Sequence, residues 1–195
     1  MKRSELPVDT VKLARYLIGK TLVYDSAQGR TAGRIVETEA YVVGDAAAHS
    51  YRGCTPRNRS LFLKRGHAYV YFIYGMWHCL NVSGEDEGVG AGVLLRALEP
   101  IEGLDLMLAR RPRARLDRLA SGPGALATAL GVDRSFDGLD LCNGAPLWLG
   151  SPLKRSGKVE IGNSTRIGIT KEAHRLQRFF ERDNPCVSGP LKLRV

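Results

Sequence analysis

The distribution of apolar and polar positions predicts β-strands in the first half of the chain, flanked by a few short helices. Period-two alternation and apolar runs place strands at 21–24, 30–41, 91–98 and, in the last third, near 147–149, 164–169 and 178–180. Helices are expected over 10–18, 100–115 and 123–130. Asp9 is suited to cap the first helix, and glycines at 19 and 131 are suited to end the first and the third.

An aromatic β-hairpin is predicted at 67–82, read H-A-Y-V-Y-F-I-Y-G-M-W-H-C-L-N-V. The turn at Tyr74-Gly75-Met76 places two large side chains at the tip, where the hairpin offers nothing to pack against. An apolar wedge on a projecting loop is a device that separates stacked bases. The other rings, at Tyr69, Phe72 and Trp77, are expected to be core residues, because aromatic residues in strands usually pack.

The strand at 30–41 carries two carboxylates on one predicted face. Alternation groups Ile35, Glu37, Glu39 and Tyr41 on one side and places small or apolar residues on the other. Two interpretations are open: a solvated outer face, which is the common fate of strand glutamates, or the lining of a cleft.

Arg96 interrupts the otherwise apolar strand at 91–98, and a buried charge needs a partner. Glu37 or Glu39 is one candidate for that partner, and a DNA phosphate is another.

The segment 42–64 is a long irregular loop with a basic character, and loops of this length are usually functional or disordered. Arg52, Arg57 and Arg59 suit phosphate groups, and Asn58 adds a hydrogen-bond donor. His49 lies in the same loop, although a single histidine is more often an ordinary surface or hydrogen-bonded residue.

Composition points to a polyanionic partner. The 195 residues are 44% hydrophobic, enough for one core, and 29 Lys and Arg against 20 Asp and Glu give a net charge of +9. Nucleic acid is the first candidate partner and an anionic membrane surface the second. No apolar run reaches the roughly 18 residues that span a bilayer, and the N-terminus lacks an apolar signal core. We therefore expect a cytoplasmic, nucleoid-associated protein without a membrane segment.

The four cysteines stand far apart without a C-x-x-C pair, so free thiols are expected and no metal site is predicted. Phosphate-loop, dinucleotide, nucleophile-elbow and H-E-x-x-H motifs are all missing from the sequence. The remaining features are stacking rings, a basic surface, carboxylates and a wedge. They describe a protein that pulls one base out of a duplex.

Six ordered blocks resemble the alkyladenine (3-methyladenine) DNA glycosylase family. They are R-I-V-E-T-E-A-Y at 34–41, A-A-H-S at 47–50, T-P-R-N-R at 55–59, Y-V-Y-F-I-Y-G-M-W-H-C-L-N-V at 69–82, V-L-L-R-A-L-E-P at 93–100 and S-G-P-G-A-L at 121–126. The resemblance implies an α+β fold: one mixed domain over 1–195, built around a curved antiparallel β-sheet with a protruding DNA-inserting β-hairpin and peripheral helices. It also implies double-stranded DNA containing damaged purines as the partner, with no cofactor, and we expect a monomer.

The resemblance also assigns roles to individual residues. Glu39 would be the general base that activates water, and the substrate pocket would be formed by Tyr41, His49, Tyr71, Asn81 and Leu94. DNA would be contacted by Tyr74 as the plug, Met76 beside it, Arg96 near the flipped nucleotide, and Arg57 and Arg59 on the loop. No lysine in these blocks suggests a Schiff base, so base release without strand cleavage is expected.

Two positions depart from the family pattern: the loop between Tyr41 and His49 is short, and Ala125 stands where many members carry lysine. A non-catalytic nucleic-acid-binding module is the alternative function. A nuclease is disfavoured, because the acidic residues do not cluster as metal ligands.

Overall fold

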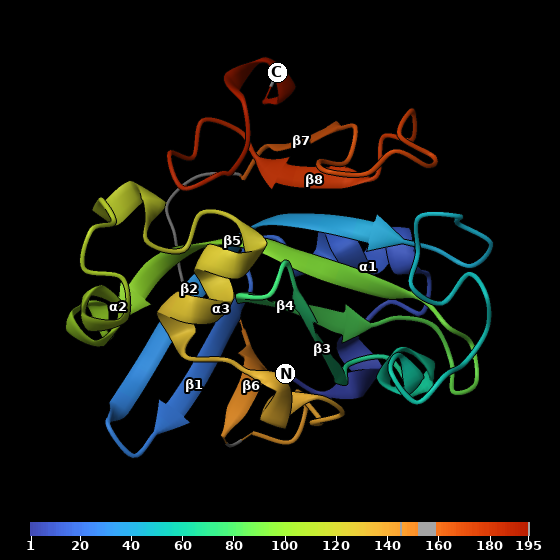
Figure 1. Ribbon diagram of the computed structural model, residues 1–195, viewed down its shortest axis with the longest axis horizontal. Helices are drawn as coiled ribbons and strands as arrows, with labels where there is room; N and C mark the ends of the chain where they lie inside the picture. Colours follow the sequence, from blue (N-terminus) through green and yellow to red (C-terminus); the bar gives the residue numbers. More distant parts are fainter. Residues whose placement is uncertain (145, 152–158, 195) are drawn as a thin grey trace.

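The computed structural model describes residues 1–144, 146–151 and 159–194 and shows an antiparallel sheet that curls around the core (Figure 1). The strands of the described part are β1 (Thr21–Ser26), β2 (Gly29–Tyr41), β3 (Ala68–Ile73), β4 (Trp77–Ser83), β5 (Gly92–Glu102), β6 (Leu147–Gly150), β7 (Ile161–Ser164) and β8 (Arg178–Glu181). They pair in the order β3-β4-β5-β2-β1-β6, while β8 joins β2 and β7 joins β8.

Helices flank this sheet. The described helices are α1 (Thr10–Leu17), α2 (Leu104–Arg110) and α3 (Pro123–Leu130), with 3-10 turns η1 (Arg3–Glu5), η2 (Arg59–Phe62), η3 (Leu116–Arg118), η4 (Arg134–Phe136) and η5 (Leu191–Leu193). The Asp9 carboxylate caps α1 by accepting from the Lys12 amide at 2.7 Å, as predicted. α1 packs against β2 and β5, and α3 packs against β4 and β5. The predicted α+β fold with a curved antiparallel sheet, a projecting hairpin and peripheral helices is confirmed.

β2 is the centre of the sheet, and its position explains why its carboxylates are buried. One edge pairs with β5; the other pairs with β1 over its first half and with β8 around Glu37 to Glu39. The solvated-face interpretation of Glu37 and Glu39 is therefore wrong, because the segments around Ile167 and Ser188 lie against that face and neither side chain is exposed. The pairing with β5 also shifts register near Glu37, so Ile35 lies in the main core with Ala40, and Val36 packs on the side of β8. The predicted grouping of Ile35 with Glu37 and Glu39 on one face is therefore wrong.

The helix predicted over 100–115 is wrong at both ends. β5 continues through Pro100 to Glu102, and α2 occupies only 104–110. A proline breaks a regular ladder, but Pro100 pairs with Gly33 at a register shift. A Cβ on Gly33 would lie 2.8 Å from the Leu98 Cβ, so only glycine permits this close approach.

The strand predicted at 164–169 is also wrong, because the strand lies earlier, at Ile161–Ser164, where it pairs with β8. The following residues leave the sheet, and the Ile167 amide donates instead to a Glu39 carboxylate oxygen at 2.8 Å. The strand near 178–180 is found where it was predicted. No helix among the described residues is long and apolar enough to cross a membrane.

Candidate active site

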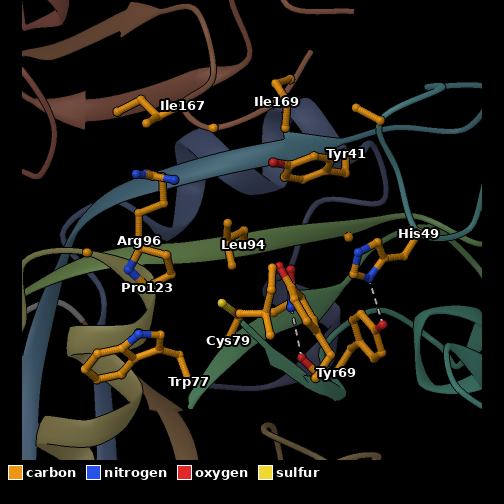
Figure 2. Close-up of a pocket in the computed structure, with 18 of the residues that line it drawn as sticks. Tyr41, His49, Tyr69, Trp77, Cys79, Leu94, Arg96, Pro123, Ile167 and Ile169 are labelled. Atoms are coloured by element: carbon orange, nitrogen blue, oxygen red, sulfur yellow. Dashed lines mark hydrogen bonds between the residues drawn. The ribbon is translucent and has the colours of Figure 1, made fainter. Parts of the chain in front are cut away.

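A cavity of about 580 Å³ opens between the β3–β4 hairpin, β5 and the N-terminal end of α3 (Figure 2). The loop after β2 and the segment 167–169 close its other sides. Its size falls within the roughly 300–1,000 Å³ of ordinary ligand pockets. The lining combines segments that are far apart in the sequence, so the curl of the sheet creates the site.

Aromatic rings from the hairpin and the loop form one wall. Tyr69 and Tyr71 lie on the same face of β3, as predicted, with ring centroids 5.4 Å apart. His49 meets the Tyr71 ring edge-on at 4.5 Å, and its Nδ1 lies 2.9 Å from the Tyr69 hydroxyl. Burial and the nearby Arg57 lower the pKa of His49, which favours a neutral imidazole. The wall therefore presents rings without a positive charge.

Asn81 and Leu94 form a cross-strand pair on β4 and β5 and both line the cavity. The Asn81 amide nitrogen donates to the Tyr69 carbonyl at 3.0 Å, which fixes its orientation. The structure thus brings together Tyr41, His49, Tyr71, Asn81 and Leu94, the residues assigned to the substrate pocket.

The Glu39 carboxylate lies directly behind this cavity, fully buried. One oxygen accepts from the Ile167 amide at 2.8 Å and lies 3.3 Å from Arg96 Nη1, and the other accepts from the Tyr41 hydroxyl at 3.0 Å. Tyr41, Arg96 and Ile167 all line the cavity, whereas Glu39 does not. A single layer of side chains therefore separates the carboxylate from the open space.

Burial raises the pKa of Glu39 above its ordinary value, although Arg96, the Ile167 amide and the Tyr41 hydroxyl oppose that effect. Glu37, two residues earlier on the same face of β2, raises the pKa of Glu39 further. A carboxyl with a raised pKa binds a proton more readily than an exposed one, which suits a base.

Arg96 finds its partners inside the protein. Its Nε donates to Glu37 at 2.9 Å and its Nη1 lies near Glu39, so the first of the two predicted kinds of partner is present. The guanidinium also reaches the cavity wall, which keeps its contact with a flipped nucleotide a prediction.

A second buried ion pair supports the cavity from outside. Arg166 and Asp45 are both fully buried, and Arg166 also donates to the Ala40 carbonyl at 3.0 Å. The Arg166 guanidinium lies over the Tyr41 ring, 4.6 Å from its centroid. This pair connects the loop after β2 to the segment that carries Ile167.

The hairpin tip is as predicted at Tyr74 and Met76, which are 79% and 64% exposed. Tyr74 and Gly75 have φ of 54° and 68°, and the Met76 amide donates to the Ile73 carbonyl at 3.3 Å. Positive φ at both central residues is what a type I′ turn requires, and it is uncommon for tyrosine. An exposed aromatic ring thus occupies a strained backbone position.

The core assignment made for three hairpin rings holds only for Tyr69, which is 1% exposed. Phe72 and Trp77 are 49% and 37% exposed, so that prediction is wrong for both. They lie at the outer end of the hairpin, beyond the part that packs on the sheet. Trp77 lines the cavity and rests against Gly124, where a Cβ would lie 3.2 Å from its side chain.

The basic loop is only partly as expected. Arg57 and Arg59 are exposed, so they remain available to phosphates. Asn58, in contrast, is not available to a phosphate. It is 4% exposed, and its amide nitrogen donates to the carbonyls of His49 at 2.8 Å and Gly53 at 3.0 Å. Its role is to hold the loop that carries His49.

Sequence reasoning missed the cavity residues of the C-terminal half, among them Ile167 and Ile169 (Figure 2). Their segment was interpreted as a strand, and the only local signal against this was Gly168, which adopts a φ of 79°. Residues 121–125, where the predicted helix at 123–130 begins, also form part of the cavity wall, which no local pattern indicates; Ala125 belongs to this wall. Within the described residues, no three His, Cys, Asp or Glu side chains gather as metal ligands.

Comparison with known proteins identifies relatives along nearly the whole chain. The family model described as methylpurine-DNA glycosylase matches residues 4–185. A protein of Mesorhizobium japonicum, provisionally named a 3-methyladenine DNA glycosylase, is 62% identical over 191 residues, which cover 98% of this chain and 91% of that protein. The DNA-3-methyladenine glycosylase of Mus musculus is 47% identical over 194 residues, which cover 91% of this chain and 58% of the mouse protein.

A curved antiparallel sheet with a ring-lined cavity beside a projecting hairpin, in a chain with these relatives, defines a DNA glycosylase, an enzyme of DNA repair. The chain belongs to the methylpurine-DNA glycosylase family. DNA is accordingly its partner.

Proposed function

We propose that this enzyme is a monofunctional glycosylase that flips alkylated or deaminated purines out of duplex DNA and hydrolyses their N-glycosidic bond. The proposed substrates are 3-methyladenine and 7-methylguanine, with hypoxanthine and ethenoadenine as further candidates. The observation that carries the proposal is the buried Glu39 carboxylate behind a cavity lined with rings. The names of the relatives support the choice of purine substrates.

In the proposed reaction Glu39 acts as general base. The water oxygen forms a bond to C1′ while the bond from C1′ to the purine nitrogen breaks. The electron pair of the broken bond leaves with the purine. The proton of the water passes to the Glu39 carboxylate, whose negative charge also stabilises the oxocarbenium-like sugar. The attacking water would lie against the part of the cavity wall formed by Tyr41, Arg96 and Ile167. There it would replace the Tyr41 hydroxyl as the hydrogen-bond donor to one Glu39 carboxylate oxygen.

The charge of the cavity suits a cationic purine. Alkylation at a ring nitrogen gives the base a positive charge, which the faces of Tyr41 and Tyr71 attract. His49 is held neutral, and Arg96 is balanced by two carboxylates, so neither adds an uncompensated positive charge. Arg111 also lines the cavity, but its Nη1 is turned to the carbonyls of Arg118 and Leu119. Base extrusion costs a few kcal/mol, and stacking returns about 1 to 3 kcal/mol per base. Two rings therefore offset much of that cost.

At the rim of the cavity, Tyr74 would fill the gap left in the duplex, with Met76 beside it. Arg57 and Arg59 would contact phosphates and position the duplex. Among the described residues that line the cavity there is no lysine. This supports hydrolysis without a Schiff base and hence an abasic product without strand cleavage. We propose that the enzyme acts as a monomer.

The substitution Glu39→Gln tests the mechanism, because the amide keeps the shape of the side chain but cannot take the proton. Binding to duplex DNA should persist, while release of free purine from methylated duplex falls by about 10²- to 10⁴-fold. The released base is measured by chromatography of the supernatant. Undiminished release by this variant would remove Glu39 from the mechanism.

A panel of oligonucleotides, each with a single lesion, tests the substrates. The expected product is free purine and an intact strand that alkali can cleave. Binding without release of any purine by the wild-type protein would instead support the non-catalytic module.

A further inference from the structure

Glu37 is a second buried carboxylate that the proposed reaction does not use. It does not line the cavity, and its side chain is fully buried between two arginines. One oxygen accepts from Arg96 Nε at 2.9 Å and from Arg178 Nε at 2.6 Å. The other accepts from the Ser188 amide at 2.6 Å. Burying a charge so completely is costly unless every contact is satisfied, and these contacts satisfy it.

The guanidinium of Arg96 is held on two of its edges by groups outside the cavity. Glu37 takes Nε, and the Ser188 hydroxyl lies 3.2 Å from Nη2. This leaves Nη1 facing Glu39 at 3.3 Å, longer than the contact to Glu37. Because the guanidinium is planar with donors in fixed directions, fixing two edges fixes the third.

Glu37 is in turn held by the C-terminal part of the chain. Arg178 on β8 lies with its guanidinium among Glu37, the Ser164 hydroxyl at 2.8 Å and the Ser188 carbonyl at 2.9 Å. Burial disfavours ionisation of Glu37, but Arg96 and Arg178 outweigh it and hold its pKa below the ordinary value. Glu37 is therefore a fixed negative charge two residues from Glu39.

We propose that Glu37 is a positioning residue for base release: together with Ser188 it orients Arg96, and it takes up enough of the arginine's charge to leave Glu39 an effective base. Without Glu37, the same guanidinium would pair fully with Glu39 and weaken it as a base. This inference rests on the proposed role of Glu39.

Charged and titratable groups reach Glu39 from several elements. Arg96 on β5 and the Tyr41 hydroxyl favour its ionised form, as does the Ile167 amide. Glu37 opposes ionisation, and Cys79 on β4 lies close enough for Glu39 to raise the pKa of its thiol. Of these, Glu37 is the one carboxylate, so its removal changes the pKa of Glu39 in a predictable direction.

The test is the pH dependence of purine release from methylated duplex DNA under single-turnover conditions. Glu39 must be ionised to act, so activity is lost as pH falls through its pKa. Glu37→Gln removes a negative neighbour and lowers that pKa, which moves the acid limb to lower pH by about one unit. The plateau rate should also fall, by about 10- to 100-fold, because the carboxylate is a weaker base and Arg96 is less well oriented.

Glu181→Gln is the matched control. Glu181 is a buried carboxylate on the neighbouring strand β8 and pairs with Arg34, outside the cavity lining. This variant makes the same chemical change, and a comparable loss of stability is expected because Glu181 is also a buried, paired carboxylate. Its acid limb and plateau should be those of the wild type.

Ser188→Ala provides a second variant. It is a smaller change, so it should fold even if Glu37→Gln does not. It removes the contact to Arg96 Nη2 without changing any charge. The plateau rate should fall while the acid limb stays in place. An unchanged plateau in Ser188→Ala overturns the positioning of Arg96.

An acid limb that stays in place, or moves to higher pH, in a folded Glu37→Gln variant overturns the proposal whatever its plateau rate. The test separates the two proposals. Full activity of Glu39→Gln removes the proposed mechanism, whereas an inactive Glu39→Gln beside an unshifted Glu37→Gln removes only the role of Glu37.

Discussion

Glu39 is surrounded by groups that act on its proton in opposite directions, and this balance sets how it can function. Burial and Glu37 favour the protonated form, while Arg96, the Ile167 amide and the Tyr41 hydroxyl favour the carboxylate. Tyr41, Arg96 and Ile167 line the cavity, and Glu37 contacts Arg96. Their removal one at a time should move the pH profile of base release in directions fixed by the sign of each effect.

Tyr41→Phe should move that profile opposite to Glu37→Gln. The Tyr41 hydroxyl donates to Glu39 at 3.0 Å, so its loss removes a contact that stabilises the carboxylate and raises the pKa of Glu39. The acid limb of purine release is expected at higher pH than in the wild type. The ring is retained, so stacking on the base should persist.

The measurement is again the single-turnover rate of release from methylated duplex against pH. Tyr69→Phe is a suitable control, because it also removes a buried cavity hydroxyl but one that contacts His49 rather than Glu39. An acid limb that moves equally in both variants would contradict the specific contact to Glu39.

At the scale of elements, the β3–β4 hairpin places rings on both sides of one turn. Its inner rings line the cavity, and its tip projects beyond the sheet. Trp77 rests on Gly124 at the start of α3, so the outer end of the hairpin, next to the turn, is braced by a glycine that leaves room for the indole. A rigid support of this kind lets an exposed tip keep its direction.

Tyr74 has a φ of 54°, a conformation that asparagine tolerates far better than tyrosine. Tyr74→Asn should therefore raise the free energy of unfolding by about 1 kcal/mol while it removes the wedge. Thermal unfolding measures the first effect. Binding to duplexes with and without a single lesion measures the second, and binding to the damaged duplex should weaken more.

Tyr74→Phe is the control for this prediction, since it keeps the ring and the strained turn. It should bind both duplexes as the wild type does. Equal losses on damaged and undamaged duplex in Tyr74→Asn would contradict a wedge that acts on the flipped state.

At the scale of the whole molecule, the cavity is assembled from segments that the chain folds back upon one another. The Asp45–Arg166 pair joins the loop after β2 to the C-terminal segment, and both side chains are fully buried. It lies outside the cavity, behind the Tyr41 ring. The pair therefore holds together two walls that are otherwise separated along the sequence.

Asp45→Asn should lower the free energy of unfolding by about 3 to 5 kcal/mol, because it leaves the buried Arg166 without a charged partner. Thermal or denaturant unfolding gives the value. Asp25→Asn removes a carboxylate that also pairs with an arginine, Arg30, but at the surface. That control should change stability little. A loss at Asp45 no larger than at Asp25 would contradict a structural role for the buried pair.

Local elements were largely readable from the sequence, and failures arose where distant contacts override local preference. The capped helix at 10–17, the aromatic hairpin and the helix begun by Pro123 follow from short-range rules. The strand through Pro100 does not, because it depends on Gly33 in the facing strand. Asn58 likewise looked like a surface donor, and only the folded loop shows its amide turned inward.

By itself, the sequence determined the residue types of the site: a carboxylate on a long strand, rings in a hairpin and a basic loop. The projecting tip follows from the hairpin pattern, whereas the proposed base and pocket residues were named through the resemblance of six sequence blocks to a known family. Only the tertiary structure decided that Glu37 and Glu39 are buried, that Arg96 lies between them and that Ile167 completes the site. Those facts depend on β8 and the C-terminal segment covering β2, contacts across more than 120 residues that no local pattern encodes.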